Sequence, residues 1–434
     1  MKTQQLQRRI TRREAVIGVV GQGYVGLSLA ASAAVEGMTV RAVDVDTDRI
    51  QQLAAGSNVV PGVDDALFAN AVEAGRLFFG TDAAALADCD VVVICVPTPV
   101  VEHRPDLRFI EDAGRAVAGH LRRDSLVVLE STTYPGTTEQ VLRPLLEAHG
   151  LRAGRDFLLA YSPERIDPGN VKYGLRNTPR VVGGIDEPSS QTAGMFYDQL
   201  VDEVEVLSSC RAAEMAKLLE NTFRMVNIAL VNELATLCSE QQIDVWEVIR
   251  AAATKPFGFM PFYPGPGVGG HCIPLDPTYL AWQSRRDTGR PFRLVETAQD
   301  INAHMPTYVT SRVIEALSDH GKAVKGANIL ALGVTYKPDV GDLRESAAIE
   351  VLARLVSKGA KVTFHDPFVT EIREHGLSLR GSSLSRTSLA AADIVLLLTP
   401  HSTYDVDMVA EHAKLLFDAR NATNGSRRPT VVTL

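Results

Sequence analysis

Residues 15–26 read Ala-Val-Ile-Gly-Val-Val-Gly-Gln-Gly-Tyr-Val-Gly, and this stretch decides the fold of the first half of the chain. The apolar, β-branched run at residues 15–20 predicts a buried parallel strand, and the glycines after it predict a tight turn. Residues 27–36 predict a helix, and residues 39–43 predict a second strand that ends at Asp44. Strand, GxGxxG, helix, strand and acid, in this order, are the fingerprint of a dinucleotide-binding βαβ unit.

Each part of this fingerprint has a physical reason. Gly21, Gly23 and Gly26 allow the turn and let a pyrophosphate approach the helix N-terminus, where N–H groups and the helix dipole favour anions. Asp44 stands where an acid accepts hydrogen bonds from the adenine ribose, which favours NAD over NADP. Arg49 is close enough in sequence to assist at that ribose or to tolerate a phosphate there. We therefore expect NAD as the cofactor, rather than a glycine-rich turn that binds nothing.

Three further predicted strands end in polar turns. The strands are residues 90–96, 126–130 and 157–161, and the turns carry Thr98, Thr132, Glu164 and Arg165. A polar residue after a strand often only caps the next helix. Because open α/β sheets bind ligands at the carboxyl ends of their strands, we interpret these turns together as the lining of a cleft.

A long helix is predicted for residues 212–241, which contain almost no helix breakers. Apolar residues cover much of its circumference, so we expect burial on more than one side, as a link between domains or as a dimer core. Lys217 and Asn221 are four residues apart and share one face, either as functional groups or as part of a solvated surface. We predict a homodimer, or an oligomer built from dimers, that packs through this helix.

Residues 264–277, PGPGVGGHCIPLDP, predict a rigid loop with a thiol at its tip. Glycine and proline dominate the first seven positions, so neither a helix nor a strand is expected to continue through the stretch. Cys272 precedes Asp276 by four residues, which suggests a nucleophile beside a base. The alternative is a small buried hydrophobic residue in a tight loop.

A second α/β alternation begins near residue 325 and predicts another parallel sheet. It lacks GxGxxG, so we expect it to bind a different ligand. Lys337, Arg344 and Arg420 lie just past strand ends or at a helix start, which suits a phosphate-bearing ligand. Each of them alone could also be an ordinary surface charge.

The expected fold class is therefore α/β, with two Rossmann-like parallel-sheet domains joined by a long central helix. We place an NAD-binding domain at residues 1–208 and a central helical, dimerisation region with the cysteine loop at residues 209–318. A second Rossmann-like domain for the substrate occupies residues 319–434.

Composition excludes several other classes. The chain has 434 residues, a formal net charge of -8 and 45% hydrophobic residues, so it is large enough for several cores and has no pervasive basic field for nucleic acid. Its five cysteines form no CxxC pair, which argues against a zinc site or a disulfide framework and fits a reducing, cytoplasmic location. We interpret residues 1–13 as a basic, frayed tail, and expect no membrane span and no metal.

A nicotinamide site combined with a nucleophilic cysteine suggests oxidation beyond an aldehyde. A thiolate can add to an aldehyde, the thiohemiacetal can give up a second hydride, and water can hydrolyse the resulting thioester. The overall change is an alcohol to a carboxylate with two NAD.

Along essentially its whole length the sequence resembles the UDP-glucose/GDP-mannose dehydrogenase family. The motifs that carry the resemblance are VVGQGYVGLSLA with Asp44, VPTP, ESTTYPGTT, SPER, AEMAKLLENTFRMVNIALVNELA, GPGVGGHCIPLDP, GVTYKPDVGDLRES and FDARN. Several of them, such as YSPERIDPGN and NTPRVVGG, resemble the branch that oxidises UDP-N-acetylglucosamine at C6. The resemblance implies a UDP-sugar as substrate.

The resemblance also implies roles at matching positions. Cys272 is the nucleophile, Lys217 stabilises an oxyanion, and Glu164 assists thioester hydrolysis. Asp276, Thr132 and Asn221 position the water or base of the first oxidation. The residues expected at the cofactor are Gly21, Gly23, Tyr24, Val25, Gly26, Asp44, Arg49, Thr98, Thr132 and Arg344. Those expected at the substrate are Glu164, Arg165, Lys217, Asn221, Phe262, Tyr263, Gly267, Lys337 and Arg420.

Some positions depart from the pattern of UDP-glucose dehydrogenases. Leu275 stands where those enzymes usually carry a lysine, and residues 254–257 lack the arginine that reaches the sugar. Both argue for a UDP-N-acetylhexosamine, with UDP-N-acetylmannosamine as the nearest alternative and UDP-glucose after it. The alternatives from other classes are a two-electron hydroxyacid dehydrogenase, which needs no cysteine, and a non-catalytic nucleotide-binding module. His271 either tunes the thiol or has a structural role.

Overall fold

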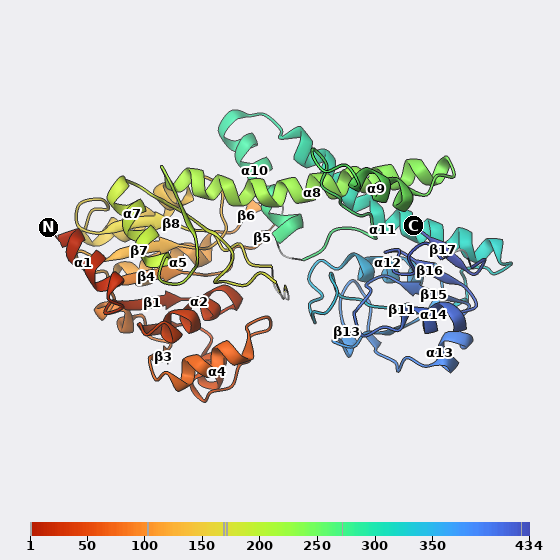
Figure 1. The fold of residues 1–434 in the computed structure, drawn as a ribbon, viewed down its shortest axis with the longest axis horizontal. Helices are drawn as coiled ribbons and strands as arrows, with labels where there is room; N and C mark the ends of the chain where they lie inside the picture. The colour runs from red at the N-terminus through yellow and green to blue at the C-terminus, as the bar shows by residue number, and fades with distance from the viewer. Residues whose placement is uncertain (1, 102–103, 168–169, 171, 271, 427) are drawn as a thin grey trace. The chain divides into compact units, whose positions relative to one another are not determined.

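The computed structural model describes residues 2–101, 104–167, 170, 172–270, 272–426 and 428–434 (Figure 1). Contacts divide the chain into two compact units. The first unit comprises residues 1–220 and 278–286, and the second comprises residues 221–277 and 287–434. The two units are considered separately below.

The first unit is built on an eight-stranded sheet in the order β10-β9-β8-β7-β4-β1-β2-β3. Its strands are β1 Val16–Val20, β2 Thr39–Val43, β3 Leu77–Gly80, β4 Val91–Ile94, β7 Leu126–Leu129, β8 Leu158–Tyr161, β9 Arg180–Gly184 and β10 Val204–Leu207. All neighbours pair in parallel except β8 and β9, which are antiparallel. The central strands β4 and β7 are buried along their whole length, which is why their sequences are continuous apolar runs.

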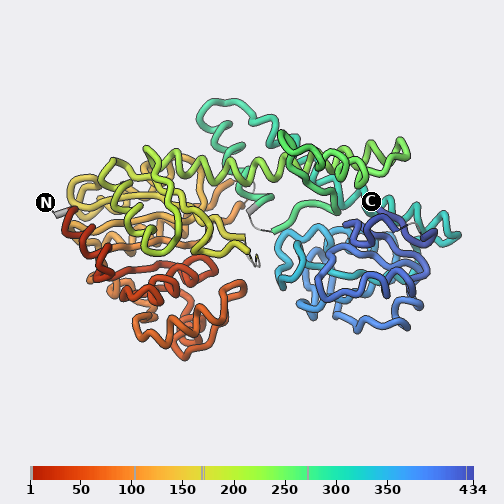
Figure 2. Tube along the Cα trace, in the orientation of Figure 1, coloured from red at the N-terminus to blue at the C-terminus, as the bar shows by residue number. Residues whose placement is uncertain are grey.

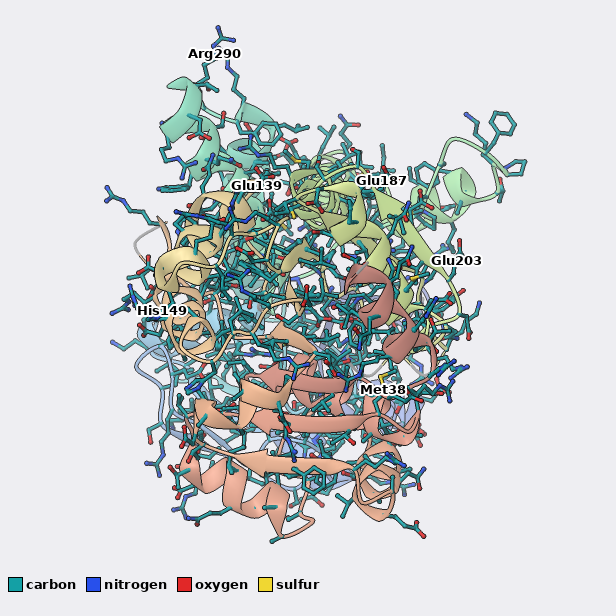
Figure 3. All side chains as sticks on the ribbon, turned by 90° about the vertical axis from the view of Figure 1, so that its left-hand side faces the viewer. Met38, Glu139, His149, Glu187, Glu203 and Arg290 are labelled. Atoms are coloured by element: carbon teal, nitrogen blue, oxygen red, sulfur yellow. The ribbon has the colours of Figure 1, made fainter. Side chains whose placement is uncertain are left out.

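Helices cover both faces of this sheet. They are α2 Tyr24–Val35, α3 Thr47–Ala54, α4 Asp65–Glu73, α5 Arg108–Ala118, α6 Arg143–Leu146 and α7 Glu187–Tyr197. The short helices η1 Ala83–Asp88, η2 Thr138–Leu142 and η3 Glu147–His149 and the hairpin of β5 Val100–Val101 and β6 Arg104–Pro105 complete the unit. In Figure 3, Glu187 and Glu203 lie at its rim, where both are exposed, whereas Met38 is buried.

The N-terminal residues correct one expectation, because they form a helix, α1 Lys2–Thr11, and not a frayed tail. Leu6 and Ile10, four residues apart, are 4% and 0% exposed and belong to the core between the sheet and α7. Arg9 also forms an ion pair with buried Asp90 at 2.6 Å. The N-terminal segment, shown in red in Figure 2, is thus held as a helix by two apolar side chains that pack against a complementary surface.

The second unit contains a five-stranded, fully parallel sheet in the order β12-β11-β15-β16-β17. Its strands are β11 Asn328–Leu332, β12 Lys361–His365, β15 Ile394–Leu397, β16 Leu416–Asp418 and β17 Val431–Thr433, and a separate hairpin pairs β13 Glu371–Ile372 with β14 Leu379–Arg380. The core on one face involves α11 Arg293–Asp319 and α12 Ala347–Ser357, and the core on the other involves α13 Arg386–Ala391 and α14 Val406–His412. The predicted α/β class, with two Rossmann-like sheets, is confirmed.

The long helix is α8 Cys210–Glu240, which begins in the first unit and continues in the second. The helix α9 Val245–Ala253 follows it. We expected α8 to be buried on more than one side. Within a single chain it is not, because several of its large apolar side chains are exposed. They are Met215 44%, Leu219 63%, Phe223 47%, Leu230 61% and Leu237 49%.

The cysteine stretch corrects a second expectation. A helix, α10 Cys272–Thr288, starts at Cys272, so the thiol-bearing residue opens a helix instead of standing at the tip of a loop. Proline is tolerated in a first helical turn, where the missing N–H has no partner to lose, so Pro274 does not prevent this start. Pro277 lies inside the helix and removes only one backbone hydrogen bond. Among the described residues, no helix has the length and hydropathy needed to cross a bilayer.

Candidate active site

The glycine turn of the first unit leaves room for a ligand at the start of α2. Gly21 has a φ of +93°, and a Cβ there would lie 2.6 Å from the carbonyl oxygen of Cys95. A Cβ at Gly26 would lie 1.8 Å from the carbonyl oxygen of Gly21, so both glycines are needed for the turn itself. Gly23 differs, because a Cβ there would meet nothing within 4 Å among the described residues. Glycine is needed at position 23 only if a ligand occupies the space that a side chain would fill. A pyrophosphate fits there.

Asp44 is fixed at the end of β2 by backbone donors. Its carboxylate accepts hydrogen bonds from the N–H groups of Gln22 at 2.6 Å and Asp46 at 2.9 Å, and the residue is 8% exposed. Arg49 reaches the same carboxylate at 3.1 Å. The acid and its neighbouring base therefore lie together at the end of β2.

The remaining cofactor candidates of this unit lie at the carboxyl ends of adjacent strands. Tyr24 and Val25 open α2 after β1, Thr98 follows β4, and Thr132 follows β7. Thr98 is buried, and its carbonyl oxygen accepts a hydrogen bond from the hydroxyl of Tyr279 on α10. The residues of this edge therefore fit a bound dinucleotide.

Glu164 and Lys217 form a buried pair in the first unit. The Lys217 ammonium donates to the carbonyl oxygen of Glu164 at 2.6 Å, and each residue is 8% exposed. The Glu164 carboxylate accepts from Arg180 at 2.8 Å. Arg165 points elsewhere, to the carbonyl oxygen of Pro179 at 2.6 Å and to the carboxylate of a residue on α8. Sequence reasoning missed Arg180, although it lies in the NTPRVVGG motif, because a residue inside a strand gives no signal for the site.

In the second unit, Asn221 and Asp276 form a hydrogen bond of 2.5 Å from the Asn221 amide to the Asp276 carboxylate. Asp276 is 2% exposed and lies four residues after Cys272 in α10. His271 and the Cys272 side chain lie outside the described part of the chain. A buried carboxylate oriented by an amide can hold a water or accept a proton.

The loop before Cys272 is held by residues that sequence reasoning missed. Gly265 donates to Asn232 on α8 at 3.0 Å, and Asn232 donates to Asn302 on α11 at 2.9 Å. Gly270 donates to the carbonyl oxygen of Arg344 at 3.0 Å, and a Cβ at Gly270 would lie 2.8 Å from the ring of Tyr336. The glycines of this loop are therefore required by the close approach of the second sheet's loops. Because neither amide carries charge, composition and spacing offered no signal for Asn232 and Asn302.

Arg420 lies beside the same loop. With Gly267, Thr335 and Thr399 it lines a small cavity, and a Cβ at Gly265 would lie 2.3 Å from its guanidinium. Burial lowers the pKa of Arg420 to about 10, and among the described residues it forms no ion pair. A partly buried cation without an ion-pair partner among the described residues suits an anionic ligand group.

The other predicted substrate and cofactor residues of the second unit are more exposed. Lys337 is partly buried in the turn after β11. Arg344 is bound to Asp342 through two nitrogen atoms, at 3.0 Å and 2.6 Å. Phe262 packs edge-to-face on Phe223, and half-exposed Tyr263 stacks on Trp246. No group of His, Cys, Asp and Glu able to hold a metal ion occurs among the described residues.

Comparison with known proteins matches three successive segments of the chain to three domains of one family. Residues 15–201 match the NAD binding domain of the UDP-glucose/GDP-mannose dehydrogenase family, residues 211–304 its central domain, and residues 330–425 its UDP binding domain. The chain belongs to this family. It is an NAD-dependent nucleotide-sugar dehydrogenase, an oxidoreductase that acts on CH–OH groups, and the predictions of family, enzyme class and NAD are confirmed.

Two curated relatives and one solved structure illustrate the similarity of this dehydrogenase. A UDP-N-acetyl-D-mannosamine dehydrogenase of Yersinia pestis is 37% identical over 89% of this chain and 94% of its own length. A UDP-N-acetyl-D-glucosamine 6-dehydrogenase of Pseudomonas aeruginosa is 35% identical over 93% and 94%. The structure of a UDP-D-ManNAc dehydrogenase from Pyrococcus horikoshii matches with a TM-score of 0.86 and 32% identity, covering 96% of this chain and 98% of that one.

Proposed function

We propose that this dehydrogenase oxidises the 6-hydroxymethyl group of a UDP-N-acetylhexosamine to the uronic acid, with UDP-N-acetylglucosamine as the first candidate. The observation that carries the proposal is the bond between Asn221 and Asp276 one helical turn after Cys272. It supports an oriented carboxylate beside a thiol, which a four-electron oxidation needs and a two-electron oxidation does not.

The glycine turn and Asp44, with Arg49, Thr98 and Arg344 in supporting positions, would hold NAD. Each of two NAD molecules, bound in turn, would supply the hydride acceptor for one of the two oxidations. In the first oxidation the hydroxyl proton passes to the base or water held by Asp276, Asn221 and Thr132. The Cys272 thiolate then adds to the aldehyde carbon, a C–S bond forms, and Lys217 stabilises the oxyanion of the thiohemiacetal.

Loss of the second hydride leaves a thioester. Water attacks its carbonyl carbon, the C–S bond breaks, and the thiolate of Cys272 leaves while Glu164 accepts the proton of the water. In the second unit, the cavity beside Arg420 and Gly267 suits a UDP phosphate, and Lys337, Phe262 and Tyr263 are the candidates for neighbouring groups of the substrate.

The choice of sugar rests on the sequence of the loop. Leu275 stands in place of the lysine expected for UDP-glucose, and residues 254–257 lack the expected arginine. The sequence around Cys272 resembles that of enzymes for N-acetylated substrates. The names of the relatives include both the gluco and the manno epimer, so UDP-N-acetylmannosamine is the second candidate.

The deciding experiment is a stoichiometry. Purified protein receives limiting UDP-N-acetylglucosamine and excess NAD, and the NADH formed per sugar consumed is counted. Two NADH per sugar with a uronic acid product support the proposal, whereas one NADH with an aldehyde product contradicts the covalent mechanism. If UDP-N-acetylglucosamine is not turned over but UDP-N-acetylmannosamine gives two NADH per sugar, the substrate is the other epimer. Equal rates on UDP-glucose reject specificity for N-acetylated sugars.

The cysteine itself is tested by Cys272→Ser. We expect no carboxylate from this variant, because an oxygen nucleophile with an ordinary pKa does not replace the thiolate. A normal rate of carboxylate formation would reject the thioester route and favour two separate two-electron oxidations.

We also propose a homodimer that packs through α8. Its support is the row of exposed apolar side chains on that helix, which includes Leu219, Phe223 and Leu230. Light scattering should give the mass of two chains, and a monomeric mass rejects this arrangement. A cytoplasmic location is proposed together with it, since Cys89, Cys95, Cys210 and Cys238 are free and buried.

A further inference from the structure

Four buried charged side chains form a continuous network in the first unit. They come from the end of β7, the start of β9, the turn after β8, and α8, and are Glu130, Arg180, Glu164 and Lys217. Their exposed fractions are 2%, 3%, 8% and 8% in that order. With both carboxylates ionised, the charges balance.

Arg180 is the centre of this network. Its Nη1 donates to Glu164 Oε2 at 2.8 Å, its Nη2 donates to Glu130, and its Nε donates to the hydroxyl of Ser162 at 2.9 Å. The guanidinium therefore lies between two carboxylates that would otherwise share one buried space. Charges buried in this way are stable only while each has a partner.

The other oxygen of Glu164 is also occupied. Glu164 Oε1 accepts from the N–H groups of Arg165 and Ile166, both at 2.7 Å. Burial alone would raise the pKa of Glu164, but the charge of Arg180, the Ile166 N–H and the charge of Lys217 outweigh it, so the pKa is lowered. The Glu164 carboxylate is thus held ionised and in one orientation.

Glu130 has the opposite character. Burial raises its pKa, and the nearby charge of Glu164 adds to the effect, although Arg180 opposes it. Besides Arg180 on β9, two groups face Glu130 from other elements. They are Tyr197 on α7, whose hydroxyl donates at 2.5 Å, and Cys95 after β4, whose sulfur lies 3.5 Å away. A proton entering the network is therefore placed on Glu130 and not on Glu164.

We propose that Arg180 is a positioning residue that keeps Glu164 ionised and correctly oriented, and that Glu130 takes up any proton that enters the network. The inference rests on the proposed function, in which Glu164 accepts the proton of the water that attacks the thioester. A protonated Glu164 cannot accept that proton, and without Arg180 the two carboxylates would share one proton between them.

The test uses Arg180→Gln, Glu130→Gln and the double variant in the full chain. Each is mixed with UDP-sugar and NAD, and the first NADH burst is recorded. The acylated Cys272 is quantified by intact mass after acid quench across pH 3–9, a range that includes the lowered pKa of Glu164. We expect Arg180→Gln to retain the burst and to accumulate thioester through roughly tenfold slower hydrolysis. The acid limb, the low-pH side of the pH profile of the hydrolysis rate, should move up by about one pH unit or more.

The double variant tests the positioning role more directly. Removing the competing carboxylate lets Glu164 ionise again, so Arg180→Gln with Glu130→Gln should recover most of the lost hydrolysis rate. Glu130→Gln alone should leave the acid limb in place, because Glu130 already carries a proton when Glu164 takes up its own. This variant probes the network even if Arg180→Gln fails to fold. A matched control is Arg122→Gln, whose partner Asp90 keeps the ion pair with Arg9, and its acid limb should equal that of the unmodified chain.

An unchanged acid limb in folded Arg180→Gln, or a double variant no better than the single one, overturns the positioning role and leaves Arg180 with a purely structural one. An acid limb that moves downward in Glu130→Gln overturns the role of Glu130, because Glu130 would then still be ionised when Glu164 takes up its proton. Failure of the proposed function gives a different result, because no variant, including Glu164→Gln, would then form a thioester on Cys272.

Discussion

Asp44 and Asp366 hold the same turn in two different sheets. Asp44 Oδ2 accepts a hydrogen bond of 2.6 Å from Gln22 in the turn after β1, and Asp366 Oδ2 accepts one of 2.8 Å from Val334 in the turn after β11. In both residues, Oδ1 accepts from the N–H two positions further on, at 2.9 Å. The second sheet thus repeats the strand, turn and acid arrangement of the first without its GxGxxG sequence.

The two acids differ in what else they contact. Asp44 reaches partly exposed Arg49, whereas Asp366 contacts Nε2 of His401 at 3.0 Å, with both side chains fully buried. The N–H of Asp339 donates to Nδ1 of His401 at 3.0 Å, so that nitrogen carries no proton and Nε2 is the donor to Asp366. The Asp366 carboxylate is thus occupied within the chain by His401 and by the backbone N–H groups of Val334 and Phe368.

The first prediction follows from this contrast. Asp44→Ala should raise KM for NAD by about tenfold or more, because a charged acceptor of the ribose hydroxyls is lost. Asp366→Ala should leave KM for NAD unchanged but lower the midpoint of thermal unfolding, since buried His401 loses its partner. Initial rates against NAD concentration, together with unfolding scans, check both, and equal effects of the two variants on KM would contradict the assignment.

The second prediction concerns the glycine turn. Gly23→Ala should fold normally but bind NAD weakly, because its methyl group meets no protein atom and occupies the space assigned to the pyrophosphate. Gly26→Ala should destabilise the unit, since its methyl group would overlap the carbonyl oxygen of Gly21. Calorimetric titration with NAD and thermal unfolding separate the two effects. Unweakened NAD binding by Gly23→Ala would place the pyrophosphate elsewhere.

The third prediction concerns the cavity beside Arg420. Gly265→Ala should displace the guanidinium and weaken binding of UDP by roughly tenfold, while NAD binding is unchanged. Gly119→Ala is the matched control, because a Cβ there would meet only a carbonyl oxygen at 3.7 Å. Calorimetric titration with UDP measures the effect, and full UDP affinity in Gly265→Ala would remove Arg420 from the phosphate site.

The fourth prediction concerns α1. Ile10→Ala should destabilise the first unit by about 2–5 kcal/mol, the usual cost of removing a fully buried aliphatic side chain. Gln5→Ala, on the exposed side of the same helix, should leave the free energy of unfolding unchanged within about 0.5 kcal/mol. Denaturant titration compares them. A result for Ile10→Ala as small as that for Gln5→Ala would mean that α1 does not pack as described.

The sequence by itself determined the parts that depend on local pattern. The run around Gly21 and Asp44, the alternation of strands and helices in both halves, and a long helix predicted at residues 212–241 and observed at Cys210–Glu240 follow from local pattern. Periodicity, glycine geometry and acid position act over short distances. The same motifs identified the family and NAD. The roles of individual site residues stay predictions, with Asn221 and Asp276 placed in hydrogen-bonding contact.

Tertiary structure alone decided the rest. The N-terminal segment is helical because Leu6 and Ile10 find a surface formed by distant residues, and α10 begins at Cys272 although the sequence there is rich in proline. The partnership of Arg180 with Glu130 and Glu164 joins residues that are 50 and 16 positions apart. No local rule shows such a pair, because a charge can be buried only where the whole fold supplies its counter-charge.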